Sequence, residues 1–258
     1  MNTSKNKTKD TLKHLASIFL GLTLGFWLFA CEGSETDVTP DTPTSPNAVK
    51  IMALGASRVE GARPVFESYR YELWKLMTDQ NWDIDLVGTM EDESTYPAYS
   101  GKRFDNDHEG RSGWTSSQIR SGINDWLSQG GAPDIVLFSS PGGNDGLTGA
   151  SYSNAVNNVN AIIDALQAAN PNVTIIIEQM APAHSRSQTQ QLDEFMRQMN
   201  AEVVNIASAQ STASSKVLTV DMNTGFNDDL LADDVHYNEA GARFIAQRYF
   251  QVLSTLIN

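Results

Sequence analysis

Four polar segments of the chain contain the residue types that nucleophilic catalysis uses. They are Gly55–Gly61 (GASRVEG), Asp105–Trp114 (DNDHEGRSGW), Pro141–Asp145 (PGGND) and Asp233–His236 (DDVH). A serine hydroxyl is a weak nucleophile, so it needs a base, and a third group must hold that base in place. Together the segments supply a serine, a histidine and carboxylates, and they could form such a site if the fold brings them together.

Ser57 is the candidate nucleophile. It follows an apolar run and lies between Gly55 and Gly61, a pattern that can leave the serine exposed at the start of the next helix. The free N–H groups at a helix start favour developing negative charge. The alternative is a serine that only caps this helix, which is a common use of serine.

The candidate base is a histidine near the end of the chain. His14 lies in the N-terminal segment, which leaves His108, His184 and His236. Because Asp233 precedes His236 by three residues, a compact turn would let the carboxylate accept from the far imidazole nitrogen and fix its tautomer. The alternative is an acidic loop that caps a helix. His184 could line the site or be a solvated loop histidine.

The remaining two segments each allow two interpretations. Pro141–Asp145 could be a plain turn, or its glycines could let an acyl group approach while the Asn144 amide donates to an oxyanion. The alternating carboxylates of Asp105–Trp114 look like the start of a calcium loop. An EF-hand loop that begins at Asp105 needs a carboxylate at its twelfth position, which is Ser116. We therefore expect no metal, and a turn that presents a backbone N–H to an anion.

Strand-like and helix-like segments alternate along the chain. Apolar runs predict strands at 49–54, 83–87, 134–139, 173–177 and 217–220, and helical spacing predicts helices at 66–77, 119–127, 155–169, 192–209 and 240–256. Near-continuous apolar strands separated by helices predict a parallel sheet covered on both faces. Ligands bind beyond the carboxyl ends of the strands in such sheets, where we expect the four polar segments to lie.

The order of the site residues resembles that of the SGNH (GDSL-like) hydrolases. In that family a serine ends the first strand, a glycine follows the second, an asparagine lies in a G-x-N-D turn, and a D-x-x-H motif comes late. The resemblance implies a flavodoxin-like three-layer α/β/α sandwich with a five-stranded parallel sheet. A closer similarity, to carbohydrate esterase family three and its acetylxylan esterases, rests on five segments: Ile51–Ser57, Tyr69–Trp74, Val87–Thr89, Asp107–Thr115 and Gly142–Asp145.

The resemblance implies a role for each matching residue. Ser57 is the expected nucleophile, with Asp233 and His236 completing the triad. The expected oxyanion donors are the backbone N–H groups of Ser57 and Gly113 and the side chain of Asn144. The acids around Gly113 are then expected to brace its loop, and no cofactor is needed.

One position departs from the family pattern. The family usually has aspartate before the serine, whereas this chain has Ala56, followed by Arg58 on the other side of Ser57. The aspartate is not a member of the triad, so the chemistry can survive its absence. A slow or inactive enzyme is the alternative that this change leaves. Trp114 could stack on a sugar ring or be a core residue, and His184 is the other possible substrate-binding residue.

The charge balance is strongly acidic. The formal net charge is −13, and because residues 1–30 hold four lysines and one aspartate, residues 31–258 carry 14 of the 18 basic and 30 of the 31 acidic side chains. Phosphate binding needs a basic surface, so we expect no nucleic-acid partner.

The N-terminal residues are typical of a targeting segment. Four lysines precede an apolar run at 15–30, which is shorter than the roughly 20 residues of a membrane span and predicts a secretory signal peptide over residues 1–30. Leu28–Cys31 resembles a bacterial lipobox, which predicts a lipidated Cys31. The alternative is an ordinary signal or anchor helix with an incidental thiol.

The expected organisation is a lipoprotein with one folded domain. Residues 32–47 are rich in proline, threonine and acids and predict an extended tether, so that 31–47 links the lipid to a domain at 48–258. We expect an exported bacterial lipoprotein, membrane-anchored at the outer membrane or cell surface.

Three functions fit these observations. The first is a serine esterase that removes acetyl groups from polysaccharide, with acetylated xylan as the model substrate. The second is a lysophospholipase or thioesterase, because the fold hosts both and does not separate them. The third is a non-catalytic, glycan-binding surface lipoprotein, which the Ala56 departure motivates.

Overall fold

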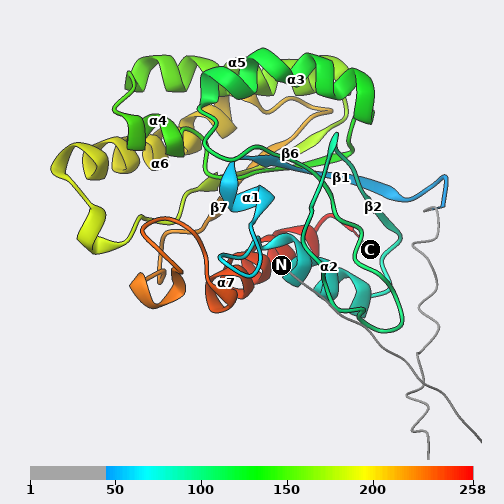
Figure 1. Ribbon diagram of the computed structural model, residues 1–258. Helices are drawn as coiled ribbons and strands as arrows, with labels where there is room; N and C mark the ends of the chain where they lie inside the picture. The colour runs from blue at the N-terminus through cyan, green and yellow to red at the C-terminus, as the bar shows by residue number, and fades with distance from the viewer. Residues whose placement is uncertain (1–44, 258) are drawn as a thin grey trace, which may run out of the picture. The chain divides into compact units, whose positions relative to one another are not determined.

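The computed structural model describes residues 45–257, which form a sheet with helices on both faces (Figure 1). The predicted signal peptide, Cys31 and most of the predicted tether lie outside these residues. Among residues 45–257, no helix is long and apolar enough to span a membrane.

The five parallel strands predicted from the sequence are all present. They are β1 (Val49–Gly55), β2 (Ile84–Leu86), β5 (Ile135–Phe138), β6 (Thr174–Gln179) and β7 (Val217–Asp221). β1 lies in the interior of the sheet and pairs in parallel with β2 and β5, and the sheet continues through β6 to β7. The predicted α/β class with a parallel sheet is confirmed.

The prediction of five strands was too low, because the described residues form a seven-stranded sheet. The additional strands are β3 (Met90–Glu91) and β4 (Asp107–Gly110), and β4 runs parallel to β1. β2 pairs with the first half of β1, and β4 pairs with the last two residues of β1, Leu54 and Gly55. The sequence of β4 looked like a loop because it is polar, yet His108 and Glu109 are fully buried.

The helices form one layer on each face of the sheet. In Figure 1, α3, α4, α5 and α6 lie on one side, and α2 and α7 lie on the other. Their bounds are α1 (Ser57–Glu60), α2 (Arg70–Asp79), α3 (Ser116–Gly130), α4 (Gly143–Thr148), α5 (Tyr152–Ala169), α6 (Gln190–Gln210) and α7 (Glu239–Leu253). Several helices begin at a residue whose side chain accepts a hydrogen bond from a backbone N–H of the first turn. Thr189 accepts from the Leu192 N–H at the start of α6, and Asn238 accepts from the Gly241 N–H at the start of α7.

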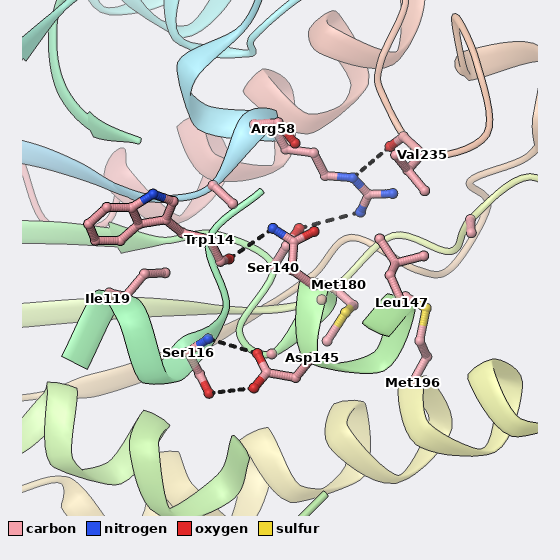
Figure 2. A pocket seen from close by; sticks show the side chains of 16 residues that line it. Arg58, Trp114, Ser116, Ile119, Ser140, Asp145, Leu147, Met180, Met196 and Val235 are labelled. Atoms are coloured by element: carbon pink, nitrogen blue, oxygen red, sulfur yellow. Dashed lines mark hydrogen bonds between the residues drawn. The ribbon is translucent and has the colours of Figure 1, made fainter. Parts of the chain in front are cut away.

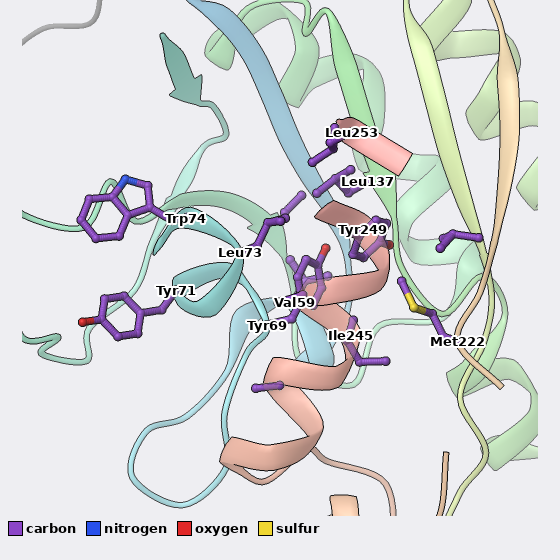
Figure 3. Packing of buried hydrophobic residues seen from close by; sticks show 14 of the residues in the cluster. Val59, Tyr69, Tyr71, Leu73, Trp74, Leu137, Met222, Ile245, Tyr249 and Leu253 are labelled. Carbon is purple, nitrogen blue, oxygen red and sulfur yellow. The ribbon is translucent and has the colours of Figure 1, made fainter. Parts of the chain in front are cut away.

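Each face of the sheet carries its own hydrophobic core. Along β1, Ile51 and Ala53 belong to the core under α2 and α7, whereas Met52 and Leu54 belong to the core under α3, α5 and α6. This alternation follows from the two-residue period of a strand. Figure 3 shows the first core, in which Leu73, Ile245 and Tyr249 are among the buried side chains. The three-layer prediction is therefore confirmed.

One predicted helix begins later than expected. The apolar spacing suggested a start at Phe66, but α2 begins at Arg70. Phe66 instead lies in the preceding loop, where its backbone forms an isolated antiparallel β-bridge with Ala62. Its ring packs on a residue of the candidate site described below.

Candidate active site

Ser57 lies directly beyond the carboxyl end of β1. The strand ends at Gly55, and Ser57 is the first residue of the short helix α1. A Cβ atom at Gly55 would come within 2.8 Å of Val59 and 3.0 Å of the Ser139 carbonyl oxygen. Glycine therefore lets the chain turn tightly between β1 and the end of β5, which leaves the hydroxyl of Ser57 half-buried at the edge of the sheet.

The side chains of Ser57, His236 and Asp233 form a continuous hydrogen-bonded chain. The Ser57 hydroxyl is 2.8 Å from His236 Nε2, and His236 Nδ1 is 2.7 Å from Asp233 Oδ2. Ser57 and His236 are 179 residues apart in sequence, so the fold brings these two predicted site residues together. The arrangement can carry a proton away from the serine hydroxyl.

Asp233 is held by its own loop as well as by the imidazole. Its Oδ1 accepts from the backbone N–H groups of Val235 at 2.8 Å and His236 at 2.7 Å. Partial burial raises the pKa of Asp233, but the hydrogen bonds from His236 and the two N–H groups outweigh it, so the pKa lies below its ordinary value. Asp233 therefore stays ionised at neutral pH.

The neighbouring residue Asp234 lies elsewhere. Its side chain is exposed and pairs with Arg186 Nε at 2.6 Å. The three-residue spacing thus selected the carboxylate that contacts the imidazole. On another side of the imidazole, the Phe66 ring stacks against His236 with 3.8 Å between ring centroids, which restricts the orientation of the base.

Gly113 lies in an exposed turn between β4 and α3. Its φ of +76° is a backbone conformation that favours glycine, and open space surrounds the position of a Cβ atom. The Trp114 N–H donates to the Arg111 carbonyl oxygen at 3.1 Å and closes this turn. The Glu60 carboxylate of α1 accepts from the Ser112 N–H, so the helix that starts at Ser57 also holds the Gly113 loop.

Asn144 reaches the same region from α4. Its side-chain nitrogen donates to the Trp114 carbonyl oxygen at 2.8 Å. An amide nitrogen carries two hydrogens, so this bond orients the amide and uses one of them. Sequence reasoning predicted Asn144 but did not predict its contact with Trp114.

Asp145, which follows Asn144, ties α4 to the start of α3. Its carboxylate is buried and accepts from the Ser116 N–H at 2.7 Å and the Ser116 hydroxyl at 2.8 Å (Figure 2). Asn158 of α5 donates to the same hydroxyl at 3.1 Å. This buried network holds α4, which carries Asn144, next to the start of α3, which follows the Gly113 turn.

The acidic stretch before Gly113 supports the backbone around it. Asp105 accepts from the Leu86 N–H at 2.8 Å, while the buried Glu109 accepts from the Thr89 N–H at 2.9 Å and Arg111 Nη2 at 2.6 Å. These carboxylates thus bind β2, the segment after it and the arginine at the start of the Gly113 turn. Of the acids expected to brace the Gly113 loop, Glu109 contacts its start through Arg111, whereas Asp105 holds β2.

Arg58 is a residue whose role the sequence did not reveal. Its buried guanidinium donates to the carbonyl oxygens of Val235 at 2.8 Å, Ala181 at 2.8 Å and Pro182 at 3.1 Å. It therefore joins the Ser57 turn, the loop after β6 and the loop that carries His236. The only signal in the sequence was its unusual place directly after the serine.

Glu178 is a second residue that sequence reasoning missed. It is fully buried at the end of β6, and its Oε2 accepts from the Ser140 N–H at 2.7 Å. Ser140 has a φ of +47° and precedes the turn that carries Asn144. Burial raises the pKa of Glu178 above its ordinary value, although the nearby Tyr249 hydroxyl, the bond from the Ser140 N–H and the charge of Arg58 oppose the shift.

A small cavity of ≈ 40 Å³ opens beside Ser57. Its lining includes Ser57, Arg58, Trp114, Asn144, Met180 and Met196. The predicted substrate-binding residue Trp114 therefore faces it, and its ring also packs on Trp126 at 5.5 Å. His184 is not among the lining residues. Its Nδ1 lies 3.4 Å from Asp228, and its neighbour Ala183 lines the cavity instead.

A family model described as GDSL-like lipase/acylhydrolase matches residues 78–244. The chain belongs to this family. The matched segment includes Gly113, Asn144, Asp233 and His236, and it begins after Ser57. The predicted relationship to the SGNH (GDSL-like) hydrolases is thus confirmed. No curated protein matches the chain by sequence.

Solved structures of family three carbohydrate esterases are similar to this chain. One from Talaromyces cellulolyticus is 30% identical, with a TM-score of 0.70, and the match covers 81% of this chain and 97% of that one. One from Clostridium thermocellum is 31% identical, with a TM-score of 0.64 and coverage of 82% and 100%. An acetyl esterase mutant that contains an acetate ion is 30% identical, with a TM-score of 0.70 and coverage of 81% and 97%.

Proposed function

We propose that the protein is a serine esterase that removes acetyl groups from polysaccharide through an acetyl-enzyme. The observation that carries the proposal is the chain of contacts from the Ser57 hydroxyl to His236 at 2.8 Å and on to Asp233 at 2.7 Å, beside a small cavity. Membership of the family and the similarity to family three carbohydrate esterases support a carboxylic ester hydrolase.

The first half of the reaction forms the acetyl-enzyme. His236 Nε2 takes the Ser57 proton while the serine oxygen bonds to the ester carbonyl carbon. The negative charge on the carbonyl oxygen is stabilised by the N–H groups of Ser57 and Gly113 and by the Asn144 amide. The bond to the sugar oxygen then breaks, and the proton on His236 Nε2 passes to that oxygen.

The second half releases acetate. A water molecule gives a proton to His236 Nε2 as its oxygen bonds to the acyl carbon, and the bond from that carbon to Ser57 then breaks. The proton returns to the serine oxygen. In both halves Nε2 must start as an acceptor, so Nδ1 carries hydrogen and donates to Asp233. The two backbone bonds to Asp233 keep that carboxylate in position.

The cavity supports a short acyl group. A volume of ≈ 40 Å³ corresponds to about three water molecules, since each needs roughly 10–15 Å³ measured in this way. An acetyl group is of that size, whereas an octanoyl chain is much larger. The acetate ion in the 30% identical acetyl esterase mutant is in line with this substrate class.

We also propose that the protein is an exported lipoprotein anchored through Cys31. The support is the sequence pattern alone, in which lysines and an apolar run precede Leu28–Cys31. Cys31→Ser should move the protein from the membrane fraction to the soluble fraction, because stable anchoring needs acyl chains at this site. Unchanged partitioning of the variant between the two fractions would contradict the anchor.

The proposed activity is tested by acid release from a set of substrates. We expect the wild type to release acetate from acetylated xylan and to prefer p-nitrophenyl acetate over butyrate and octanoate, and we expect Ser57→Ala to do neither. A preference for octanoate would favour a lipase or thioesterase. A folded wild type that binds glycans but hydrolyses no ester would favour a glycan-binding lipoprotein.

A further inference from the structure

The cavity beside Ser57 lies on the acyl side of the reacting carbon. During acylation His236 must protonate the leaving oxygen, so the leaving group lies next to the imidazole. Ser57 and Asn144 line the cavity, whereas His236, Asp233 and Phe66 do not. A carbonyl carbon bound to Ser57, with its oxygen near Asn144, therefore directs its remaining substituent, the acyl chain, into the cavity.

Apolar side chains from three helices and two loops close this cavity. In the view of Figure 2, Trp114 and Ile119 lie on one side, Leu147 and Met196 lie on the other, and Met180 lies between them. Ile119 and Met180 are buried, Met196 is half-buried, and Leu147 is 45% exposed. Leu147 and Met196 therefore border solvent.

A larger hollow of ≈ 410 Å³ adjoins the cavity. It lies along α6, and its lining includes Gln188, Leu192, Asp193 and Asn200. The two hollows share only Met180 and Met196 among their lining residues. These two side chains therefore separate the acyl cavity from the space along α6.

Of these two methionines, Met196 is the one that a substitution can remove without disturbing the backbone of the site. Met180 is fully buried, and its N–H and carbonyl oxygen are bonded to the Asn200 side chain at 2.8 Å and 3.0 Å. Met196 lies inside the long helix α6, whose neighbours Phe195 and Met199 are buried and anchor that turn. Shortening Met196 opens the wall while α6 stays in place.

We infer that Met196 sets the maximum length of the acyl group by closing the passage between the acyl cavity and the hollow along α6. The inference rests on the proposed esterase function and deepens it. With methionine at this position, the cavity holds an acetyl group. Without its side chain, a longer acyl chain can extend into the hollow.

The test compares kcat/KM for p-nitrophenyl acetate, butyrate and octanoate in four proteins: the wild type, Met196→Ala, Met196→Phe and Val204→Ala. Each methylene accommodated in an apolar pocket changes kcat/KM by roughly 10- to 200-fold. We expect the octanoate-to-acetate ratio to rise at least about tenfold in Met196→Ala, and the butyrate-to-acetate ratio to fall in Met196→Phe. Val204 is 47% exposed on the same helix, so Val204→Ala should keep the wild-type ratios.

The outcomes separate this inference from the proposed function. If Met196→Ala is folded and still cleaves acetate but keeps the wild-type ratios, the inference is wrong and the esterase function stands. If Met196→Ala instead changed the relative kcat/KM for acetate esters of different alcohols, with no change in the acyl ratios, the leaving group would lie in the cavity and the inference would be wrong. A folded wild type that cleaves no ester contradicts the proposed function itself, and the inference with it.

Discussion

Arg58 Nε donates to the carbonyl oxygen of Val235 at 2.8 Å, which ties the residue after Ser57 to the residue before His236. Two further bonds join the same guanidinium to Ala181 and Pro182. Serine and histidine come from opposite ends of the domain sequence, so their 2.8 Å contact depends on such links between loops. Arg58 is therefore a positioning residue that holds the serine and histidine loops together.

Replacing Arg58 should separate the nucleophile from its base. We expect Arg58→Met to lower kcat for acetate release by roughly 10- to 100-fold, because displacements of about 1 Å can cost 10²-fold, and to change KM little. Arg186→Met is the matched control. Arg186 is exposed, and its side chain pairs with Asp234, which does not contact His236. A folded Arg58→Met variant with wild-type kcat would show that the link is dispensable.

Asp233 and Asp234 should differ sharply when each loses its charge. Asp233→Asn should lower kcat by about 10⁴-fold, because an amide in place of the carboxylate favours the wrong imidazole tautomer. Asp234→Asn weakens an exposed contact with Arg186 and should change kcat less than about threefold. Steady-state kinetics on p-nitrophenyl acetate measures both. The reverse ranking would assign the triad to the wrong carboxylate.

Asn144→Ala should affect the chemical step more than substrate binding. The amide is oriented by the Trp114 carbonyl oxygen at 2.8 Å and meets the oxyanion chiefly in the transition state. We expect kcat to fall by roughly 10²–10³-fold with a small change in KM. If KM rose while kcat stayed constant, Asn144 would instead contribute to ground-state binding.

His108 should make the fold sensitive to acid. Burial, together with the charges of Arg70 and Arg111, lowers the pKa of His108 to about 3. Between pH 6.5 and 3 the unfolded chain binds a proton that the folded protein does not, so the free energy of unfolding falls as pH falls. This contribution approaches about 1.4 kcal/mol per pH unit at most.

The matched variant for this effect is His108→Asn. His108 Nδ1 accepts from the Gly110 N–H at 2.9 Å, and an asparagine oxygen can accept the same bond without titrating. Denaturant unfolding at several pH values should give a shallower loss of stability below pH 6.5 in the variant than in the wild type. Equal slopes would show that His108 is protonated in the fold.

The sequence was informative where local pattern determines structure. Apolar runs predicted β1, β5, β6 and β7, and their alternation with helices predicted the layers. Motif order predicted which residues approach Ser57, because the carboxyl ends of parallel strands share one edge of the sheet. It did not predict β4, because His108 and Glu109 are polar residues whose burial depends on partners such as Thr89 and Arg111.

Long-range support for the site was also beyond sequence reasoning. Glu178 lies 38 residues from its partner Ser140, and Arg58 lies 123 residues from Ala181. A charged residue in an apolar strand or a short helix gives no local sign of such a partner. The Ala56 departure leaves a slow or inactive enzyme open, and nothing in the sequence indicates that Glu60 and Arg58 hold the serine turn to the Gly113 and His236 loops.

Labelling with an organophosphonate tests the central claim, that Ser57 is a nucleophile activated by His236. Incubation of the folded protein at neutral pH, followed by mass spectrometry of its peptides, should find the adduct on Ser57. Labelling should disappear in Ser57→Ala and slow strongly in His236→Ala, with both variants retaining the wild-type circular dichroism. A folded wild type that takes up no phosphonate, or takes it up equally in Ser57→Ala, would contradict the account.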